Sequence, residues 1–139
     1  GLNTLDQQLL QKAKSHPDIV FQGPVTDVER YFAAIDVLLL PSYREGFGNV
    51  VIEAAAMGTP AIVSTIPVPV DAVEPGKTAL VVSARSVGEL GKAMEQAWKE
   101  RKIGMEETCV KFVWTHFDSE KLCEKICERK RMLLSDGTD

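Results

Sequence analysis

The sequence is poor in the features that would identify several large classes of protein. Its longest uninterrupted apolar runs are only a few residues in a chain of 139, far short of the roughly 20 needed to cross a bilayer. With a net charge of −4 and 6% aromatic residues, it has no basic patch interleaved with aromatics, which removes the electrostatic case for nucleic acid. A P-loop and a GxGxxG pattern are both missing, so an NTPase and a dinucleotide-dependent dehydrogenase are unsupported.

Cysteine and histidine are also scarce. The three cysteines, Cys109, Cys123 and Cys127, are odd in number and show no CxxC spacing, so we expect reduced, buried thiols. A zinc site that joins them to His116 is the alternative. His16 and His116 have no accompanying Ser or Cys arrangement, so a hydrolase triad is unsupported.

What the sequence does contain is an alternation of helical and strand patterns. Its hydrophobic fraction of 45% and charged fraction of 26% are ordinary values for one globular domain. The expected strands are Asp18–Phe21, Val37–Leu40, Ala61–Ser64 and Leu80–Val82. The expected helices are Thr4–Ser15, one that starts at the capping box Thr26–Glu29, Val50–Met57, one that starts at the capping box Ser86–Glu89, Glu106–Trp114 and Ser119–Leu134.

This alternation predicts an α/β fold, a Rossmann-like parallel sheet flanked by helices with right-handed crossovers. The strands are continuous apolar runs, as expected where both faces of a sheet are covered. The helix after Ser86 is expected to turn an apolar stripe inward. That stripe consists of Leu90, Ala93, Met94, Ala97 and Trp98. Ligands of such sheets bind beyond the carboxyl ends of the strands.

The stretch Pro41–Glu53 lies at such a strand end. It joins the strand Val37–Leu40 to the helix Val50–Met57 through a glycine-punctuated turn, and the first turn of that helix offers free backbone N–H groups to an anion. Glu45 and Glu53 flank these donors, eight positions apart. Carboxylates beside a phosphate-binding turn suit a ligand with hydroxyls on both sides of a phosphate, such as a nucleotide sugar. The alternative is a solvated loop Glu45 and a Glu53 favoured only by the helix dipole.

The same stretch resembles a known family. Glu45 and Glu53, separated by seven residues that include Gly46-Phe47-Gly48, resemble the donor-site signature of GT-B-fold retaining glycosyltransferases of family GT4. The resemblance runs from about Ile19 to the last helix. It implies that the fold is the C-terminal, donor-binding domain of a GT-B enzyme.

The resemblance also implies roles for individual residues. Glu45 is the implied catalytic residue, and Glu53 is expected to bind the ribose hydroxyls. The donor sugar and phosphates are expected to contact Gly46, Phe47, Gly48, Asn49 and Val50. Gly23 and Val25 would border the base, although an ordinary connecting turn explains them equally well. Arg44 beside the motif is a phosphate ligand or, more simply, a solvated side chain.

The resemblance covers one domain of a larger enzyme. Residues 1–139 correspond to a nucleotide-sugar binding domain that is incomplete at its N-terminal end, where the family's pyrophosphate-binding Arg and Lys normally lie. The acceptor domain is absent, so we expect the chain alone to be inactive. Gly1–Thr4 show neither an initiator Met nor the regions of a signal peptide, from which we expect a processed or truncated chain. Val68 and Ala79 replace family glycines and would be strained if their φ angles were positive.

The expected function is sugar transfer from a nucleotide sugar to a hydroxyl acceptor, by a hexosyltransferase-type enzyme of polysaccharide or glycoconjugate biosynthesis, with capsule assembly as the nearest resemblance. A non-catalytic nucleotide-binding module and a GT-B-fold nucleotide-sugar epimerase are the alternatives. The resemblance implies no metal and no cofactor besides the donor. It implies a cytoplasmic location, with peripheral association of the full enzyme at the inner membrane face. An apolar stripe of Leu122, Ile126, Met132 and Leu133 suggests self-association through residues near Ile126–Leu134. The sugar, base and acceptor are not specified by the sequence.

Overall fold

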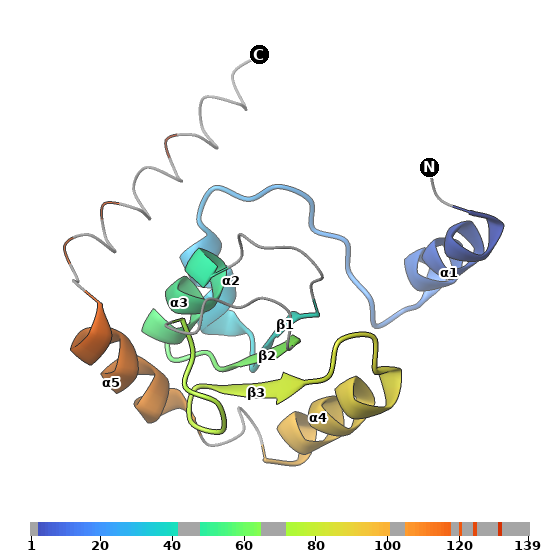
Figure 1. The fold of residues 1–139 in the computed structure, drawn as a ribbon. Helices are drawn as coiled ribbons and strands as arrows, with labels where there is room; N and C mark the ends of the chain where they lie inside the picture. The colour runs from blue at the N-terminus through green and yellow to red at the C-terminus, as the bar shows by residue number, and fades with distance from the viewer. Residues whose placement is uncertain are drawn as a thin grey trace.

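A computed structural model describes residues 3–41, 48–64, 72–100 and 105–117, together with residues 120, 124 and 131 (Figure 1). In chain order the elements are α1 (Thr4–Ser15), α2 (Val28–Ala34), β1 (Leu38–Leu40), α3 (Gly48–Ala56), β2 (Ala61–Ser64), β3 (Ala79–Val82), α4 (Val87–Glu100) and α5 (Glu106–His116). The predicted α/β fold with a parallel sheet and flanking helices is confirmed.

The sheet of the described residues has the strand order β1-β2-β3, and both pairs of neighbours are parallel. Leu39 pairs with Ile62, and Ile62 pairs in turn with Leu80. All four residues of the central strand β2 are buried, as its unbroken apolar sequence requires. Parallel strands place their carboxyl ends at one edge, so Pro41 after β1, Ser64 at the end of β2 and Ser83 after β3 lie along the same edge.

Helices cover the two faces of the sheet in different ways. On one face, Val51 of α3 packs with Ala61 and Val63 of β2. On the other face, Ile62 of the same strand packs with Ala93 and Ala97 of α4. A further layer forms where α5 covers α3, through a cluster of Ala55, Cys109, Phe112 and Val113. The β-strand period of two explains why alternate residues of β2 serve the two faces.

Helix α1 stands apart from this body (Figure 1), and none of its residues is buried. Leu5 and Leu9 expose 63% and 57% of their surface. The helix is nevertheless well bounded, because the side chain of Asn3 accepts a hydrogen bond from the backbone N–H of Asp6 at 2.8 Å. It ends at Ser15, before His16-Pro17, in agreement with the prediction.

The predicted strand Asp18–Phe21 is wrong. These residues form a turn and an extended segment that pairs with no described strand, and Val20 is 81% exposed. Its β-branched and aromatic residues favour a strand, but a strand also needs a hydrogen-bonded neighbour.

The two predicted capping boxes have different outcomes. The box at Thr26 is wrong: α2 begins at Val28 after an Asp27 N-cap that makes no side-chain capping bond, and Asp27 instead pairs with Arg30 at 3.1 Å. The second box is half confirmed. The hydroxyl of Ser86 accepts a bond from the N–H of Glu89 at 3.2 Å, but the carboxylate of Glu89 bonds to Ser83 rather than back to Ser86.

The inward stripe of α4 is only partly inward. Ala93 and Ala97 are buried, but Met94 is 44% exposed and Trp98 is 85% exposed. Ala79, predicted to be strained if its φ were positive, lies in β3 and is not among the described residues with positive φ. Val68 and most of the predicted helix Ser119–Leu134 lie outside the described residues, although Glu120, Glu124 and Arg131 are helical.

Candidate functional site at the carboxyl edge of the sheet

The centre of the candidate site is the junction of β1 with α3. The strand ends at Leu40 and the helix begins at Gly48, two residues earlier than predicted. The first N–H groups of a helix have no partner within it and carry the positive end of its dipole, so the start of α3 can hold an anion. Gly48, Asn49 and Val50 supply these groups. The predicted site residues Glu45, Gly46 and Phe47, with Arg44, lie outside the described residues.

Glu53 is the most informative charged residue of the site. It occupies the second turn of α3, beyond the first turn where a helix dipole favours a carboxylate. Its exposed fraction is only 4%, whereas Asn49, one turn earlier on the same side, is exposed. Burial of a carboxylate is unfavourable unless it is paired, and Glu53 does take part in an interaction within the chain. The dipole alone therefore does not account for this residue.

The residues expected to border the base, Gly23 and Val25, lie in an extended segment apart from the sheet. Gly23 has φ of +70°, a left-handed conformation that favours glycine, and nothing would meet a Cβ there within 4 Å. Val25 is half-buried and precedes α2. The extended segment carrying both residues leads from α1 to α2 (Figure 1).

Sequence reasoning missed a small pocket at the same edge of the sheet. Its volume is about 80 Å³, and it lies where the ends of all three strands meet the start of α4. Pro41, Ser64, Ser83, Arg85 and Ser86 contribute to its wall. The sequence did contain a sign of this pocket. Ser64 ends β2 and Ser83 directly follows β3, and the carboxyl ends of parallel strands share one edge.

The turn between β3 and α4 shapes that pocket. Arg85 has φ of +65°, and the turn is closed by a hydrogen bond from the N–H of Ser86 to the carbonyl of Ser83 at 3.1 Å. A side chain in this left-handed conformation costs roughly 1–2 kcal/mol. The carboxylate of Glu89 stabilises the turn, because it accepts bonds from the N–H and the hydroxyl of Ser83 at 2.6 and 3.0 Å. These bonds lower the pKa of Glu89.

The thiol of Cys109 belongs to the core and not to this site. It is fully buried between α5 and α3 and lies 3.6 Å from the carbonyl oxygen of Thr78. Burial, with a smaller contribution from Glu106, raises its pKa to about 11. Within the described part of the chain no group of His, Cys, Asp or Glu could hold a metal ion. Cys123 and Cys127, needed for the zinc alternative, lie outside that part.

Comparison with protein families adds a match that includes the whole of this site. A family model described as "Glycosyl transferases group 1" matches residues 1–100. The capsular polysaccharide biosynthesis glycosyltransferase CapM of Staphylococcus aureus is 29% identical over 101 residues, which are 73% of this chain and 27% of that protein. A D-inositol 3-phosphate glycosyltransferase of Corynebacterium aurimucosum is 35% identical over 89 residues, 63% of this chain and 21% of that protein. The chain thus spans about a quarter of these relatives.

A solved structure extends the likeness to three dimensions. The sucrose-phosphate synthase of Thermosynechococcus elongatus superimposes with a TM-score of 0.74 and 26% sequence identity. The superposition covers 94% of this chain and 34% of that one. The expected GT-B architecture is therefore supported by structure as well as by sequence.

Proposed function

Because the chain belongs to the group 1 glycosyltransferase family, we propose that it is the donor-binding domain of an enzyme that transfers a sugar from a nucleotide sugar to a hydroxyl acceptor. The observation that carries this proposal is the position of Glu53. A carboxylate with 4% exposure lies in the second turn of α3, one turn beyond the N–H groups of Gly48 and Asn49. An anion site and a hydroxyl acceptor adjoin each other there.

The proposed roles follow from the chemistry of each group. The N–H groups at the start of α3 stabilise the diphosphate, most strongly when its negative charge grows as the sugar departs. The carboxylate of Glu53 accepts hydrogen bonds from the ribose hydroxyls, and Glu45 acts at the sugar. Gly46, Phe47 and Val50 complete the contacts with sugar and phosphate, and Gly23 with Val25 borders the base.

The two relatives from Staphylococcus aureus and Corynebacterium aurimucosum are glycosyltransferases by name, which favours transfer over the epimerase and the non-catalytic module. Relatives that extend far beyond the matched region support a second, acceptor-binding domain in the active enzyme. We therefore expect the 139-residue chain to be inert as a transferase by itself. Biosynthesis of a surface polysaccharide is the proposed pathway, after the capsular relative.

The proposal extends to the location and assembly of the enzyme. No helix in the described part of the chain has the length and apolar character to cross a membrane. We propose a cytoplasmic enzyme, bound at the inner membrane face where its acceptor requires it, and transfer without a resident metal. Self-association through residues 126–134 is proposed from their sequence alone, since those residues, apart from Arg131, lie outside the described part.

Donor binding tests the proposal directly. The chain is titrated with UDP-, GDP- and ADP-sugars and the corresponding diphosphates, with thermal shift as the screen and calorimetry for affinity. In Glu53→Gln the volume is kept and the charge is lost, and hydrogen bonds to charged groups contribute roughly 1.5–3 kcal/mol. We expect diphosphate affinity to fall about tenfold or more.

The matched control is Glu95→Gln, which removes an exposed carboxylate from α4. It should bind as the wild type does. The unfolding transition of Glu53→Gln is measured first, so that any loss of affinity is assigned to a folded protein. Equal affinity in wild type and Glu53→Gln would contradict the ribose role. In the full-length enzyme, Glu45→Gln should lower kcat for transfer with little change in donor affinity.

A further inference from the structure

The outer face of α2 carries a pocket of about 220 Å³. Its lining residues are Asp27, Arg30, Tyr31 and Ala34, at the spacing of one helix face, and the buried Phe32 lies on the opposite face. The carboxylate of Asp27 and the guanidinium of Arg30 are paired at 3.1 Å, and their side chains are 39% and 82% exposed. The pocket thus presents hydrogen-bond acceptors and donors side by side to solvent.

The position of the Asp27 side chain is unusual for a residue that directly precedes a helix. An aspartate there ordinarily accepts a hydrogen bond from a backbone N–H of the first turn, and this bond stabilises the helix. Asp27 makes no such bond, and its carboxylate accepts one from Arg30 instead. An exposed ion pair contributes little to stability. The gain in stability therefore does not account for the arrangement.

Helix α2 places this pair beside the proposed donor site. Its last turn is fixed to the end of α3, because the hydroxyl of Thr59 donates to the carbonyl oxygen of Phe32, and the two helices pack against each other. Since α2 ends shortly before β1 begins, at the amino edge of the sheet, its first turn lies toward the carboxyl edge. Asp27 follows Val25 by two residues. The pair is therefore next to the segment proposed to border the base.

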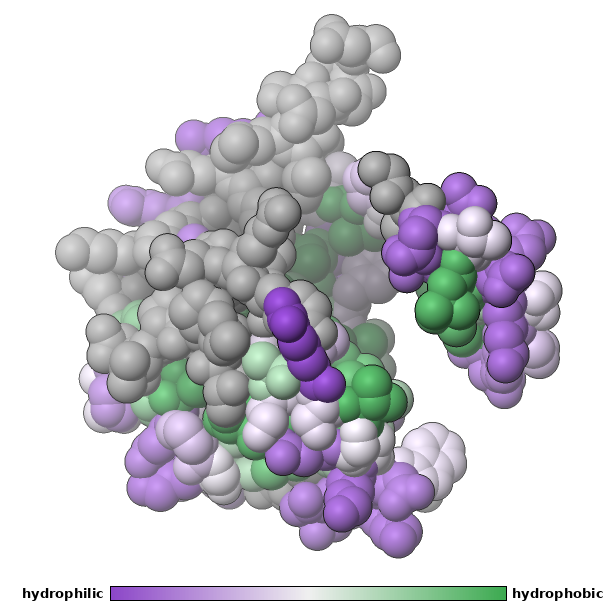
Figure 2. Space-filling model, turned by 45° about the vertical axis from the view of Figure 1, so that its right-hand side comes forward, coloured by the Kyte–Doolittle hydropathy of each residue, from purple (hydrophilic) through white to green (hydrophobic). Residues whose placement is uncertain are grey.

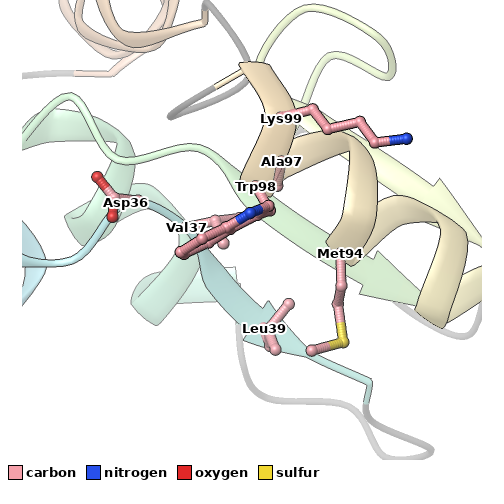
Figure 3. A pocket seen from close by; sticks show the side chains of 7 residues that line it. All are labelled: Asp36, Val37, Leu39, Met94, Ala97, Trp98 and Lys99. Carbon is pink, nitrogen blue, oxygen red and sulfur yellow. The ribbon is translucent and has the colours of Figure 1, made fainter.

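A groove of about 760 Å³ beside the outer edge of β1 has a different character (Figure 3). In Figure 3 the ring of Trp98 extends toward Val37, and the side chain of Met94 points toward Leu39. Figure 2 shows that apolar atoms also gather on the side of α1 that faces the body. Apolar walls of this kind suit the rest of the domain, which is expected on that side, and supply few hydrogen bonds to a base. The polar pocket on α2 is the better match for a base.

The pair of Asp27 and Arg30 matches the edge of one base better than the others. A guanidinium beside a carboxylate offers an N–H donor followed by two acceptor oxygens. The pairing edge of guanine presents the opposite order, with the acceptor O6 followed by the donors N1–H and N2–H. Uracil has a second acceptor where guanine has N2–H, and adenine has a donor where guanine has O6. Each of these bases would leave a polar group without its partner.

We propose that Asp27 and Arg30 recognise the base of the donor, and that this base is guanine. The inference rests on the proposed function, which places a nucleoside diphosphate at the start of α3. The carboxylate of Asp27 accepts hydrogen bonds from N1–H and N2–H, and the guanidinium of Arg30 donates to O6. The ribose lies between this pair and Glu53, and the diphosphate lies at the N–H groups of Gly48 and Asn49. The donor is accordingly a GDP-sugar.

Affinities for diphosphates that differ only in the base test this assignment. The full-length product of the natural gene is titrated with GDP, IDP, UDP and ADP by calorimetry. IDP keeps O6 and N1–H but lacks the N2 amino group, so the comparison of GDP with IDP isolates one bond to Asp27. We expect GDP to bind about tenfold more tightly than IDP, because that bond is made to a charged group. The margin over UDP and ADP should be at least as large.

The variant Asp27→Asn replaces one acceptor oxygen by an amide NH₂ group. Asparagine is as favourable as aspartate before a helix, so α2 should stay folded, and thermal unfolding checks this first. We expect GDP affinity to fall about tenfold, the difference between GDP and IDP to disappear, and UDP to show no comparable loss. The matched control is Glu107→Gln, which breaks the exposed ion pair with Lys111 on α5 and should change no affinity.

The guanidinium is tested in the same way. Arg30→Ala should weaken GDP and IDP by the same factor, because both bases carry O6, and should leave the difference between them in place. Arg30→Lys keeps a cationic donor and should recover part of the lost affinity. The two positions therefore have different signatures, one in the N2 amino group and the other in O6.

A preference for GDP over IDP that disappears in Asp27→Asn would support the proposal. Equal affinity for all four diphosphates, or a preference for UDP or ADP, would overturn it. In either of these cases the proposed function would stand, provided that Glu53→Gln weakens whichever diphosphates bind. A preference for GDP that Asp27→Asn leaves unchanged would show that other residues recognise the base. Absence of binding to every diphosphate would contradict the proposed function itself, and this inference with it.

Discussion

The carboxylate of Glu89 accepts two hydrogen bonds from Ser83, one from its backbone N–H at 2.6 Å and one from its hydroxyl at 3.0 Å. The pair joins the end of β3 to the first turn of α4, beside the pocket at the carboxyl edge of the sheet. The bonds to Ser83 lower the pKa of Glu89 below its ordinary value near 4.5.

This pair predicts a small acid dependence of stability. A carboxylate with a lowered pKa in the folded state stabilises the fold above its unfolded pKa, and the contribution is lost as pH falls through the folded value. We expect wild type to lose more stability than Glu89→Gln between about pH 5 and pH 3. Urea unfolding across that range measures the difference, with Glu95→Gln on the same helix as the control. Identical pH profiles for wild type and Glu89→Gln would contradict the prediction.

Thr59 provides a test of the interior. Its hydroxyl donates to the carbonyl oxygen of Phe32, and Thr59 is completely buried. Thr59→Val keeps the shape but leaves that carbonyl without its donor, so we expect a loss of about 1–3 kcal/mol in unfolding free energy. Thr115→Val is the matched control, because Thr115 makes the same kind of bond to Lys111 on an exposed helix surface. It should change stability by no more than about 0.5 kcal/mol.

Gly23 tests the turn expected at the nucleotide base. Its φ is +70°, and no atom beyond its two chain neighbours lies within 4 Å of the position that an alanine methyl group would take. Gly23→Ala should therefore cost about 1–2 kcal/mol through backbone conformation alone. Gly88→Ala, inside α4 and equally unobstructed, should instead stabilise the protein by about 0.5–1 kcal/mol. Thermal unfolding of both variants provides the comparison. If the turn also borders the base, Gly23→Ala should weaken diphosphate binding while Gly88→Ala leaves it unchanged.

Cys109 predicts an alkaline dependence of stability. Its pKa is raised from 9.0 to about 11 by burial. Between these values the unfolded chain releases a proton that the folded chain retains, so stability that is complete below about pH 9 declines toward pH 11. Cys109→Ala should show a shallower decline, measured by urea unfolding at fixed pH values. Equal slopes for the two proteins would show that the thiol is not responsible.

Helices and strands whose conformation is determined by their own residues could be predicted from the sequence. The strand Ala61–Ser64 and the helix Thr4–Ser15 have the bounds that their own sequences predict. An unbroken β-branched run and a helix stopped by His16-Pro17 each determine their own conformation. The location of the candidate site follows in the same way, from a strand end that leads into a helix start.

What the sequence could not supply are relations between distant segments. Asp18–Phe21 has the composition of a strand, yet strand formation depends on a partner that its own residues do not provide. The apolar stripe of α4 shows which side of the helix is apolar but not how far the sheet reaches beneath it, so the stripe does not predict the exposure of Trp98. The bond from Glu89 to Ser83 depends on the turn at Arg85, whose left-handed conformation is unusual for arginine.

The central position of β2 has an evolutionary consequence. Because Ala61 and Val63 pack against α3 while Ile62 packs toward α4, no residue of this strand has a solvent side on which substitutions are neutral. In β3, by contrast, Val81 is 40% exposed between better-covered neighbours. We therefore expect substitutions among descendants of this chain to be rare at every position of β2 and to accumulate more readily at Val81 of β3.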